Sequence, residues 1–280
     1  MKEFIEILKV LLLGIVEGIT EWLPISSTGH LILFNEFLRL DVSESFMKVF
    51  EVVIQLGAIL AVVVMFWKRL FPFSKSTTVD ERGRIYRLWL KVIVGVLPAA
   101  VLGLMLDDLL ERYLYNYVVV AAMLILYGIA FILVERHKKG KEYRIESVYD
   151  ITYKDAIIIG SYQVLSLIPG TSRSGATILG GMLTGVSRTA SAEFSFFLAI
   201  PVMLGASLLK VLKFILAGFT ASPFELVLLF IGIAVSFVVS LIVIEFLMSF
   251  VKKHSFSAFG IYRIALGAIV LTYFLIKSID

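Results

Sequence analysis

The stretch EGITEWLPISSTGH, residues 17–30, places two acids, several hydroxyls and a histidine in an otherwise apolar region. Glu17 and Glu21 are four residues apart, so on a helix they share one face. Two carboxylates this close in a poorly solvated site cannot both stay ionised cheaply, so one must take a proton or a cation must lie between them. The alternative is a pair of glutamates at a solvated helix end. An ionisable residue within a membrane span costs about 2.5–3.5 kcal/mol, which favours a functional role.

The second half of this stretch carries groups suited to nucleophilic and acid–base chemistry. His30 has an imidazole that titrates near neutral pH, so it could move a proton to or from a reacting oxygen. Ser26, Ser27 and Thr28 offer one candidate nucleophile and further hydrogen-bond donors. The plainer alternatives are that the histidine is a hydrogen-bonded packing residue and that the hydroxyls only cap a helix.

The stretch PGTSRSG, residues 169–175, has the composition of an anion-binding loop. Small residues such as Gly170 let the backbone approach an anion, and the start of a following helix offers free N–H groups and the positive end of its dipole. Arg173 adds a permanent cation whose planar fork matches phosphate oxygens. Its neighbours supply further donors: Thr171, Ser172 and Ser174. The alternative is that Arg173 only neutralises Glu17 or Glu21 in an internal ion pair.

Helices that cross a membrane must position these groups. Of the 280 residues, 59% are hydrophobic and 17% are charged, and the mean hydropathy is +0.96. This composition is too apolar for an ordinary soluble domain, and the apolar runs lack the alternation of β-barrel strands. Six stretches are long enough for a helix to cross the bilayer: 47–67, 88–106, 117–135, 190–213, 222–249 and 257–277.

Two further apolar regions, 5–40 and 154–186, are each interrupted near the middle by Pro, Gly and hydroxyl residues. Proline removes a backbone donor and glycine weakens a helix, so each region is expected to break into two half-helices. Broken backbone inside a membrane survives only where protein or a polar cavity satisfies its hydrogen bonds. We therefore predict an all-α integral membrane protein with six full transmembrane helices and two re-entrant helical hairpins.

Charges between the spans predict which side of the membrane each loop occupies. Segments 68–87 and 136–154 are rich in Lys and Arg, which indicates that they lie in the cytoplasm. The turn at 107–116 carries Asp107, Asp108 and Glu111, as expected for the outer side of the membrane. The loops account for the net charge of +4, so no nucleic-acid partner is expected. The N-terminal residues lack the features of a removable signal peptide, and the absence of Cys excludes disulfides and cysteine-bound metals.

The two halves of the chain match in layout, since each is a predicted hairpin followed by three crossings. A shift of 145 positions aligns three pairs: Pro24 with Pro169, Ser26 with Thr171, and Ser27 with Ser172. We interpret the chain as a single membrane domain, 1–280, built as an inverted-topology repeat with halves 1–140 and 141–280. Such repeats place a binding site near the midplane, where the broken helices meet, so the two motifs are expected to face each other.

Other polar residues in the apolar regions are less specific. Four charged residues lie near the ends of predicted crossings, where snorkelling to the membrane surface would explain them: Arg188, Glu193, Glu245 and Arg263. Three more could line a cavity or could only bond across helices: Gln55, Gln163 and Ser166.

The motifs resemble those of a known family, the bacterial undecaprenyl-diphosphate phosphatases of the bacitracin-resistance type. Residues 17–21 resemble its acidic motif, residues 24–30 its hydroxyl and histidine segment, and residues 169–177 its arginine motif. The similarity in layout covers essentially the whole chain. It implies an enzyme of the bacterial plasma membrane that converts the isoprenyl diphosphate to the monophosphate carrier of cell-wall synthesis. It also implies a divalent cation, a site open to the outer face and reduced sensitivity to bacitracin.

These observations give a hypothesis for the chemistry. Glu17 and Glu21 would hold Mg²⁺ or Ca²⁺, and Arg173 with nearby N–H groups would bind the diphosphate. Ser27 is the first choice of nucleophile, with His30 or Glu21 as its base, while attack by water or by His30 itself stays open. Substrate contacts are expected from the neighbouring residues Ser26, Thr28, Gly170, Thr171, Ser172 and Ser174.

Two matters stay open at the level of sequence. Inverted repeats with broken helices are also typical of secondary transporters, so the chain could move an anionic lipid or solute by alternating access. The combination of acids, hydroxyls, histidine and arginine is fuller than anion binding requires, which favours an enzyme. A homodimer is compatible with the sequence but is not required by it.

Overall fold

The computed structural model describes residues 1–73 and 77–278. Residues 74–76, residues 279–280 and the side chains of Asp107, Asp108 and Glu111 lie outside the described part, so the predicted acidic turn is not tested. The helices, in chain order, are α1 Lys2–Thr20, α2 Ser27–Phe37, α3 Glu44–Val53, α4 Gln55–Met65, α5 Trp67–Leu70, α6 Val79–Leu114, α7 Tyr117–Lys138, η1 Val148–Asp150, α8 Tyr153–Val164, η2 Leu165–Leu167, α9 Arg173–Leu183, α10 Arg188–Leu216, α11 Pro223–Lys253 and α12 Ser257–Lys277.

Six helical stretches of the described chain are long and apolar enough to cross a membrane: Glu44–Met65, Val79–Leu106, Tyr117–Lys138, Arg188–Leu216, Pro223–Lys253 and Ser257–Lys277. They coincide with the six predicted crossings, so the expectation of an all-α, multi-pass membrane protein is confirmed. The first of them is built from α3 and α4, which meet at Ile54 with helical backbone angles.

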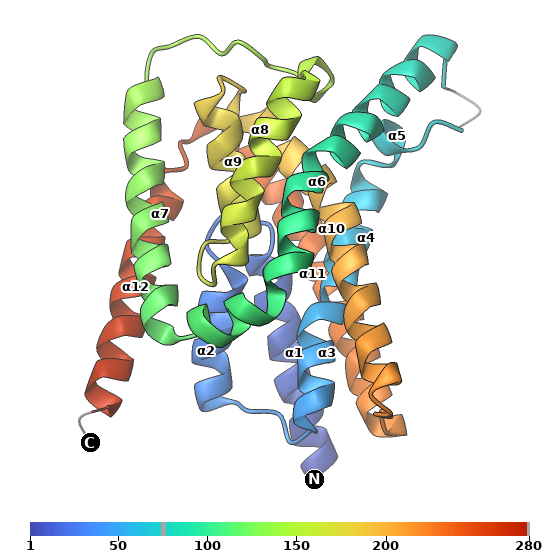
Figure 1. Ribbon diagram of the computed structural model, residues 1–280, viewed down its shortest axis with the longest axis vertical. Coiled ribbons are helices and arrows are strands. Elements are labelled where there is room, and N and C mark those ends of the chain that lie inside the picture. The colour runs from blue at the N-terminus through green and yellow to red at the C-terminus, as the bar shows by residue number, and fades with distance from the viewer. Residues whose placement is uncertain (74–76, 279–280) are drawn as a thin grey trace.

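Both interrupted regions break where the sequence predicts. In the first, α1 ends at Thr20 and α2 begins at Ser27, and in the second, η2 ends at Leu167 and α9 begins at Arg173. The pair α8 and α9 reaches from one end of the molecule toward its middle, and α1 and α2 approach the middle from the other end (Figure 1). The two connections therefore lie inside the helical bundle rather than at its ends.

The first arm of each broken region packs on a long helix that is distant in sequence, α1 on α11 and α8 on α6. At the α6–α8 crossing the backbones approach so closely that a Cβ on Gly160 would lie 1.8 Å from the carbonyl oxygen of Gly95. At the α7–α12 crossing a Cβ on Gly128 would lie 2.6 Å from the carbonyl oxygen of Gly260. Close backbone approach of this kind is how helices gain contact where lipid removes the hydrophobic driving force.

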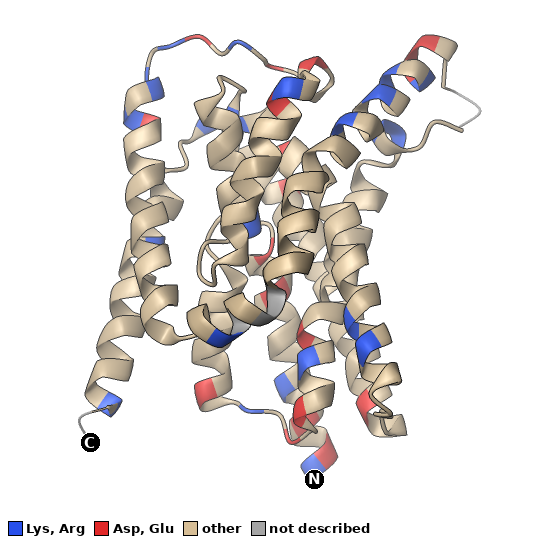
Figure 2. Cartoon of the chain, in the orientation of Figure 1, with Lys and Arg blue, Asp and Glu red and all other residues tan. Residues whose placement is uncertain are grey.

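Charged residues gather toward the two ends of the bundle, and few lie along its middle (Figure 2). The connection that follows α7 and the region around α5 lie at the same end, opposite both termini (Figure 1). The basic segments 68–87 and 136–154 were predicted to share one side of the membrane. Their described parts do lie at one end of the molecule.

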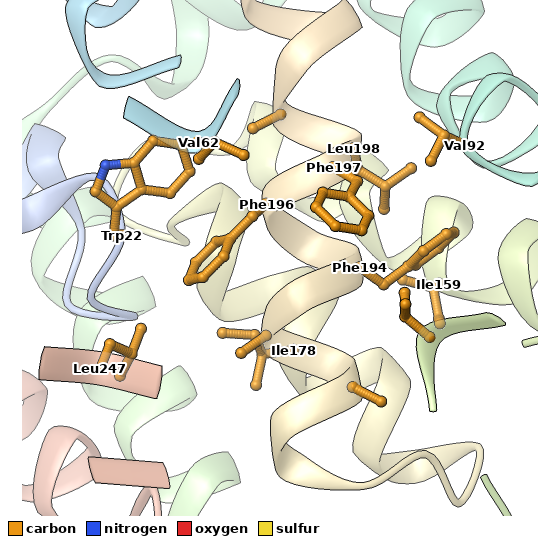
Figure 3. Packing of buried hydrophobic residues seen from close by; sticks show 14 of the residues in the cluster. Trp22, Val62, Val92, Ile159, Ile178, Phe194, Phe196, Phe197, Leu198 and Leu247 are labelled. Carbon is orange, nitrogen blue, oxygen red and sulfur yellow. The ribbon is translucent and has the colours of Figure 1, made fainter. Parts of the chain in front are cut away.

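The largest hydrophobic cluster surrounds α10 (Figure 3). Phe194, Phe196 and Phe197 of this helix are fully buried. Phe196 packs edge-on against Trp22, in the connection between α1 and α2, with ring centroids 5.1 Å apart and planes at 85°. The connection lacks a continuous helical hydrogen-bond ladder, so its contact with a central helix helps to fix its position.

Candidate active site

The two breaks use the same local device to begin their second helix. Ser26 precedes α2 and Ser172 precedes α9, and both have positive φ, at 74° and 69°. Each hydroxyl accepts a hydrogen bond from a backbone N–H three residues on, 3.4 Å from Gly29 N and 3.1 Å from Gly175 N. Residues other than glycine rarely adopt a positive φ. The caps help to stabilise this conformation because each satisfies a free N–H donor in the first turn of its helix.

This conformation corrects the alignment of the two halves. The shift of 145 places Ser26 on Thr171, whereas the matching backbone places Ser26 on Ser172, a shift of 146 (172 − 26). The second break has one more residue between its proline and its cap. Gly170 in that longer connection has φ +89, and a Cβ there would lie 2.5 Å from the carbonyl oxygen of Val120. The prolines are therefore a poor guide to register, because the loop length after them differs.

Arg173 joins the two motifs. It donates to Glu21 Oε1 from Nη2 at 2.8 Å and from Nε at 3.3 Å, and Nη1 donates to the carbonyl oxygen of Ser195 at 2.7 Å. Its Cζ lies 5.5 Å from the centre of the Trp22 ring. The side chains of Arg173 and Glu21 are each only 9% exposed. The two breaks thus meet in one buried site, as predicted, and the ion pair considered as an alternative role for Arg173 is present within it.

Glu17 and Glu21 lie one helical turn apart, because the N–H of Glu21 donates to the carbonyl oxygen of Glu17 at 3.0 Å. Glu17 is 0% and Glu21 8% exposed, which contradicts the alternative of a solvated helix end. Neither carboxylate oxygen of Glu17 has a hydrogen-bond partner within the described residues. Ser27 Oγ donates to Glu21 Oε2 at 3.5 Å. Glu21 therefore contacts both the arginine and the candidate nucleophile. The Glu17 carboxylate has no partner of this kind among the described residues.

His30 lies in the first turn of α2, and both of its ring nitrogens have partners. Nδ1 is 2.7 Å from the carbonyl oxygen of Ser26, which can only accept, so Nδ1 carries a proton. Nε2 is 2.7 Å from the hydroxyl of Tyr262, so in neutral His30 it accepts a hydrogen bond from that tyrosine. The hydrogen bond recorded for Ser27 goes to Glu21 rather than to His30. Of the two candidate bases, Glu21 is the better placed.

The remaining predicted residues differ in what their hydroxyls do. Ser174 is fully buried and donates to the carbonyl oxygen of Glu21 at 3.1 Å, so it links the two breaks directly. Ser172 Oγ lies 3.1 Å from Ser174 Oγ. Thr171 is also fully buried, and its hydroxyl has no partner in the part of the chain that the structure describes. Thr28 is partly buried in the first turn of α2.

Arg263 contradicts its sequence prediction. We expected it to lie near a membrane surface with a snorkelling side chain, but it is 0% exposed. Its guanidinium donates to the carbonyl oxygens of Pro24 at 3.2 Å, Gly170 at 2.8 Å and Thr171 at 3.0 Å. These acceptors are backbone atoms of the two breaks, so no periodicity or charge pattern in the sequence signals the contact.

Snorkelling is also wrong for Glu193, which is buried, while Arg188 is partly exposed and has an acidic partner. Glu193 pairs with Arg69, and Arg188 Nε donates to Glu135 at 2.8 Å. Glu193 and Glu135 are each 4% exposed, whereas the side chains of Arg69 and Arg188 are 51% and 27% exposed. Each pair therefore joins a buried acid to a partly exposed arginine near one end of the bundle. Glu245 is exposed on α11, as snorkelling requires.

Further site residues lie in helices without any motif around them. Ser195 of α10 and Tyr262 of α12 contact Arg173 and His30, and nothing in their sequence surroundings indicated it. Of the residues proposed to line a cavity, Gln163 is 1% exposed and its amide has no partner within the described chain. Ser166 donates to the carbonyl oxygen of Gln163 at 2.6 Å, and Gln55 is the first residue of α4.

A family model described as bacitracin resistance protein BacA matches residues 10–269. The chain belongs to this family. It is 58% identical over 272 residues to an undecaprenyl-diphosphatase of Enterococcus faecalis, covering 96% of this chain and 97% of that protein. It is 56% identical over 276 residues to an undecaprenyl-diphosphatase of Desulfitobacterium hafniense, covering 98% of each. It is 55% identical over 275 residues to undecaprenyl-diphosphatase 1 of Clostridium acetobutylicum, covering 98% of this chain and 99% of that protein.

The acids of this BacA family chain fit a divalent cation in part. The Glu17 carboxylate is buried and has no hydrogen-bond partner among the residues that the structure describes, so it needs a cation or a proton to compensate its charge. Glu21 adds a second carboxylate one turn away. Within the described residues no cluster of three or more His, Asp or Glu side chains could hold a metal ion. A cation here would therefore complete its oxygen coordination with phosphate and water, as Mg²⁺ commonly does.

Proposed function

We propose that this protein is an undecaprenyl-diphosphate phosphatase that releases inorganic phosphate and regenerates undecaprenyl phosphate, the lipid carrier of cell-wall synthesis. The ion pair of Arg173 with Glu21 is the observation that carries the proposal, because it joins a phosphate-binding motif and an acid–base motif in one buried site. Relatives named undecaprenyl-diphosphatase align with nearly the whole chain. An abundant enzyme would lower sensitivity to bacitracin, in keeping with the name of the family.

The diphosphate binds between the two breaks. Its oxygens compete with Glu21 for the guanidinium of Arg173, whose planar fork can hold two of them at once. Free N–H groups at the start of α9 and the hydroxyl of Thr171, which has no other partner in the described chain, add donors. Ser26 and Thr28 border the site from the first break. These donors stabilise the charge that grows on the transferring phosphoryl group.

Ser27 is the nucleophile in this reaction, and Glu21 is its base. The Ser27 oxygen forms a bond to the terminal phosphorus while the bond to the undecaprenyl phosphate oxygen breaks, and the hydroxyl proton passes to Glu21 Oε2. Water then attacks the phosphorus of the phosphoserine, and the bond from phosphorus to the Ser27 oxygen breaks. One proton of the water restores the Ser27 hydroxyl, inorganic phosphate leaves, and Glu21 releases the proton that it took up in the first step. His30 keeps its two hydrogen bonds and orients the start of α2. In the alternative mechanism, water attacks the terminal phosphorus directly and no phosphoserine forms.

Glu17 and Glu21 are the residues that would hold a Mg²⁺ or Ca²⁺ ion. When bound, such an ion would neutralise negative charge on the phosphoryl oxygens. Glu17 suits this role because it has no hydrogen-bond partner in the described structure and lies next to the acid that contacts Ser27. The same pair can instead share a proton when no cation is present.

The membrane arrangement that fits this chemistry has α1–α2 and α8–α9 as re-entrant hairpins in an inverted-topology repeat. Support comes from the reciprocal packing of α1 on α11 and of α8 on α6, which a two-fold exchange of the halves relates. The basic loops lie at the end opposite both termini, so the first hairpin opens to the outside of the bacterial plasma membrane.

Phosphate release in detergent tests this function. Purified protein is incubated with undecaprenyl diphosphate and Mg²⁺, and inorganic phosphate is measured over time. We expect multiple turnovers, with activity lost on chelation and restored by the cation. Detergent micelles have no compartments, so a protein that only transports lipid would release no phosphate, and that result would overturn the proposal.

A further inference from the structure

We propose that Arg263 is the positioning residue of this site: one buried guanidinium binds the backbone of both breaks and thereby fixes Arg173 against Glu21. The inference rests on the proposed function, since it explains how that site is held together. Arg263 lies on α12, outside both broken regions. It donates to main-chain oxygens of the breaks rather than to the side chains that are assigned to the reaction. Its effect on chemistry therefore passes through the backbone.

The geometry of Arg263 links three separate segments. Nη1 donates to the carbonyl oxygen of Pro24, in the first break, and Nη2 to those of Gly170 and Thr171, in the second. Nη2 and Nε also lie 3.3 Å and 3.5 Å from two carbonyl oxygens of α7, those of Met123 and Leu124. The Cζ atom lies 5.3 Å from the centre of the Tyr127 ring. All these acceptors are main-chain oxygens, so the cation serves the backbone rather than an acid.

The breaks need such a donor because their carbonyl groups lie outside regular helices. In the interior of a membrane protein no bulk water satisfies them, and each one left unpaired is costly. Arginine presents five N–H groups in a rigid plane, which lets one side chain reach carbonyl oxygens on both sides. Lysine has the same charge but presents its three donors from one atom. It cannot serve the two breaks and α7 at once.

The bound carbonyl groups lie next to the reacting side chains in sequence. Pro24 is three residues from both Glu21 and Ser27, and Thr171 is two residues from Arg173. A shift of either break relative to the other would change the separation of Arg173 from Glu21. Misplacement of about 1 Å can reduce a rate by about 100-fold. Arg263 is therefore placed to control the rate without touching the substrate.

Trp22 provides a readout of this contact that does not depend on activity. It lies in the first break, is 0% exposed, and has the guanidinium of Arg173 from the second break 5.5 Å from its ring centre. The sequence contains three tryptophans, so replacing Trp67 and Trp89 by Phe leaves Trp22 as the sole emitter. Acrylamide quenching of its fluorescence then reports whether the two breaks stay packed together.

The experiment compares Arg263→Lys with the matched substitution Arg188→Lys in this sole-tryptophan protein. Arg188 binds the buried Glu135 of α7, away from the two breaks, so its variant controls for the loss of a partly buried arginine contact. For R263K we expect kcat to fall by about 100-fold, with a smaller change in KM, and Trp22 to become more accessible to acrylamide. For R188K both quantities should stay at the parent values.

Two results overturn the inference: an R263K protein with parental kcat, or one whose kcat falls while Trp22 quenching is unchanged. If R263K does not fold, Tyr127→Leu decides, since it removes only the ring beside the guanidinium and leaves the hydrogen bonds. Y127L should change kcat and Trp22 quenching in the same directions as R263K, but by smaller amounts. If either quantity stays at the parent value, the inference is overturned. Failure of the proposed function is seen separately, as absence of phosphate release by the parent protein.

Discussion

The two breaks in the bundle share a backbone conformation and differ in the charges they carry. Each begins its second helix after a serine with positive φ that caps the N–H of a glycine three residues on. The first carries the acids and the histidine, whereas the second carries Arg173 at the position that Ser27 occupies in the first. Neither break alone could bind a phosphate and also activate a nucleophile.

The difference shows how one backbone device can serve opposite tasks. In both cases the cap sets the start of a helix inside the bundle, and the positive end of the helix dipole there favours an anion nearby. In the second break Arg173 strengthens that preference. In the first, Glu17 and Glu21 oppose it, so the site as a whole can hold both an anionic substrate and a cation. The four predictions below test each side of this comparison, beginning with the largest expected effect.

Arg173→Lys tests the cationic break. Lysine keeps the charge but loses the planar fork, so we expect kcat/KM for undecaprenyl diphosphate to fall by about 100- to 1000-fold. Phosphate release under saturating and limiting substrate measures it. Arg144→Lys is the control, since Arg144 binds Asp155 and the carbonyl oxygen of Thr184 outside the site. Near parental activity in R173K would remove Arg173 from the mechanism.

Ser27→Ala tests the nucleophile carried by the acidic break. Loss of the attacking hydroxyl should lower kcat by at least about 100-fold, and a phosphoserine trapped by acid quench and seen by mass spectrometry should disappear. Ser161→Ala is the control, because that exposed hydroxyl donates to the carbonyl oxygen of Ile157 within its own helix, away from the site. A nearly fully active S27A would show that water attacks the phosphorus directly.

Glu17→Gln tests whether the unpartnered acid holds a cation. We expect the Mg²⁺ concentration for half-maximal activity to rise by about tenfold or more. In the absence of divalent cations the variant should melt at a higher temperature than the parent, because a neutral amide is easier to bury than a carboxylate without a partner. Glu245→Gln, on an exposed face of α11, is the control. An unchanged Mg²⁺ requirement would contradict a metal role for Glu17.

Substitution of the two capping serines tests whether the breaks are equivalent in energy. Ser26→Ala and Ser172→Ala should each reduce the free energy of unfolding by about 1 kcal/mol for the lost cap, with a further loss from the strained φ. Glycine at either position should cost less than alanine, because it tolerates positive φ. Ser222, a cap with φ −68, is the control at which glycine gains no such advantage. Clearly unequal losses at the two breaks would contradict their equivalence.

The fold was predictable because the membrane restricts what a chain can do. Length and hydropathy located six spans, and Pro24, Pro169 and the glycines near them located both breaks. The meeting of the two motifs was also predictable, since a broken helix in lipid must find polar partners. The alignment of the halves was less so, because one extra residue in the second loop moves the match from Thr171 to Ser172.

The contacts that hold the site together were not predictable. Ser195, Tyr262 and Arg263 sit in apolar helices. Arg263 binds backbone carbonyl groups of segments far away in the sequence, and Ser195 offers its own carbonyl oxygen to Arg173. A main-chain oxygen is present at every residue, so the sequence gives no sign of which one a distant arginine will bind. Arg263 accordingly resembled a charge at a membrane surface until its burial was known.

By itself the sequence determined the class of protein, the positions of the spans and the two chemical motifs, because hydropathy, helix-breaking residues and side-chain chemistry are local properties. Only the tertiary structure decided that Glu21, rather than His30, contacts Ser27, that Glu17 has no partner among the described residues, and that Arg263 binds both breaks. These depend on distances of a few ångströms between segments that packing brings together, and local composition does not encode such distances.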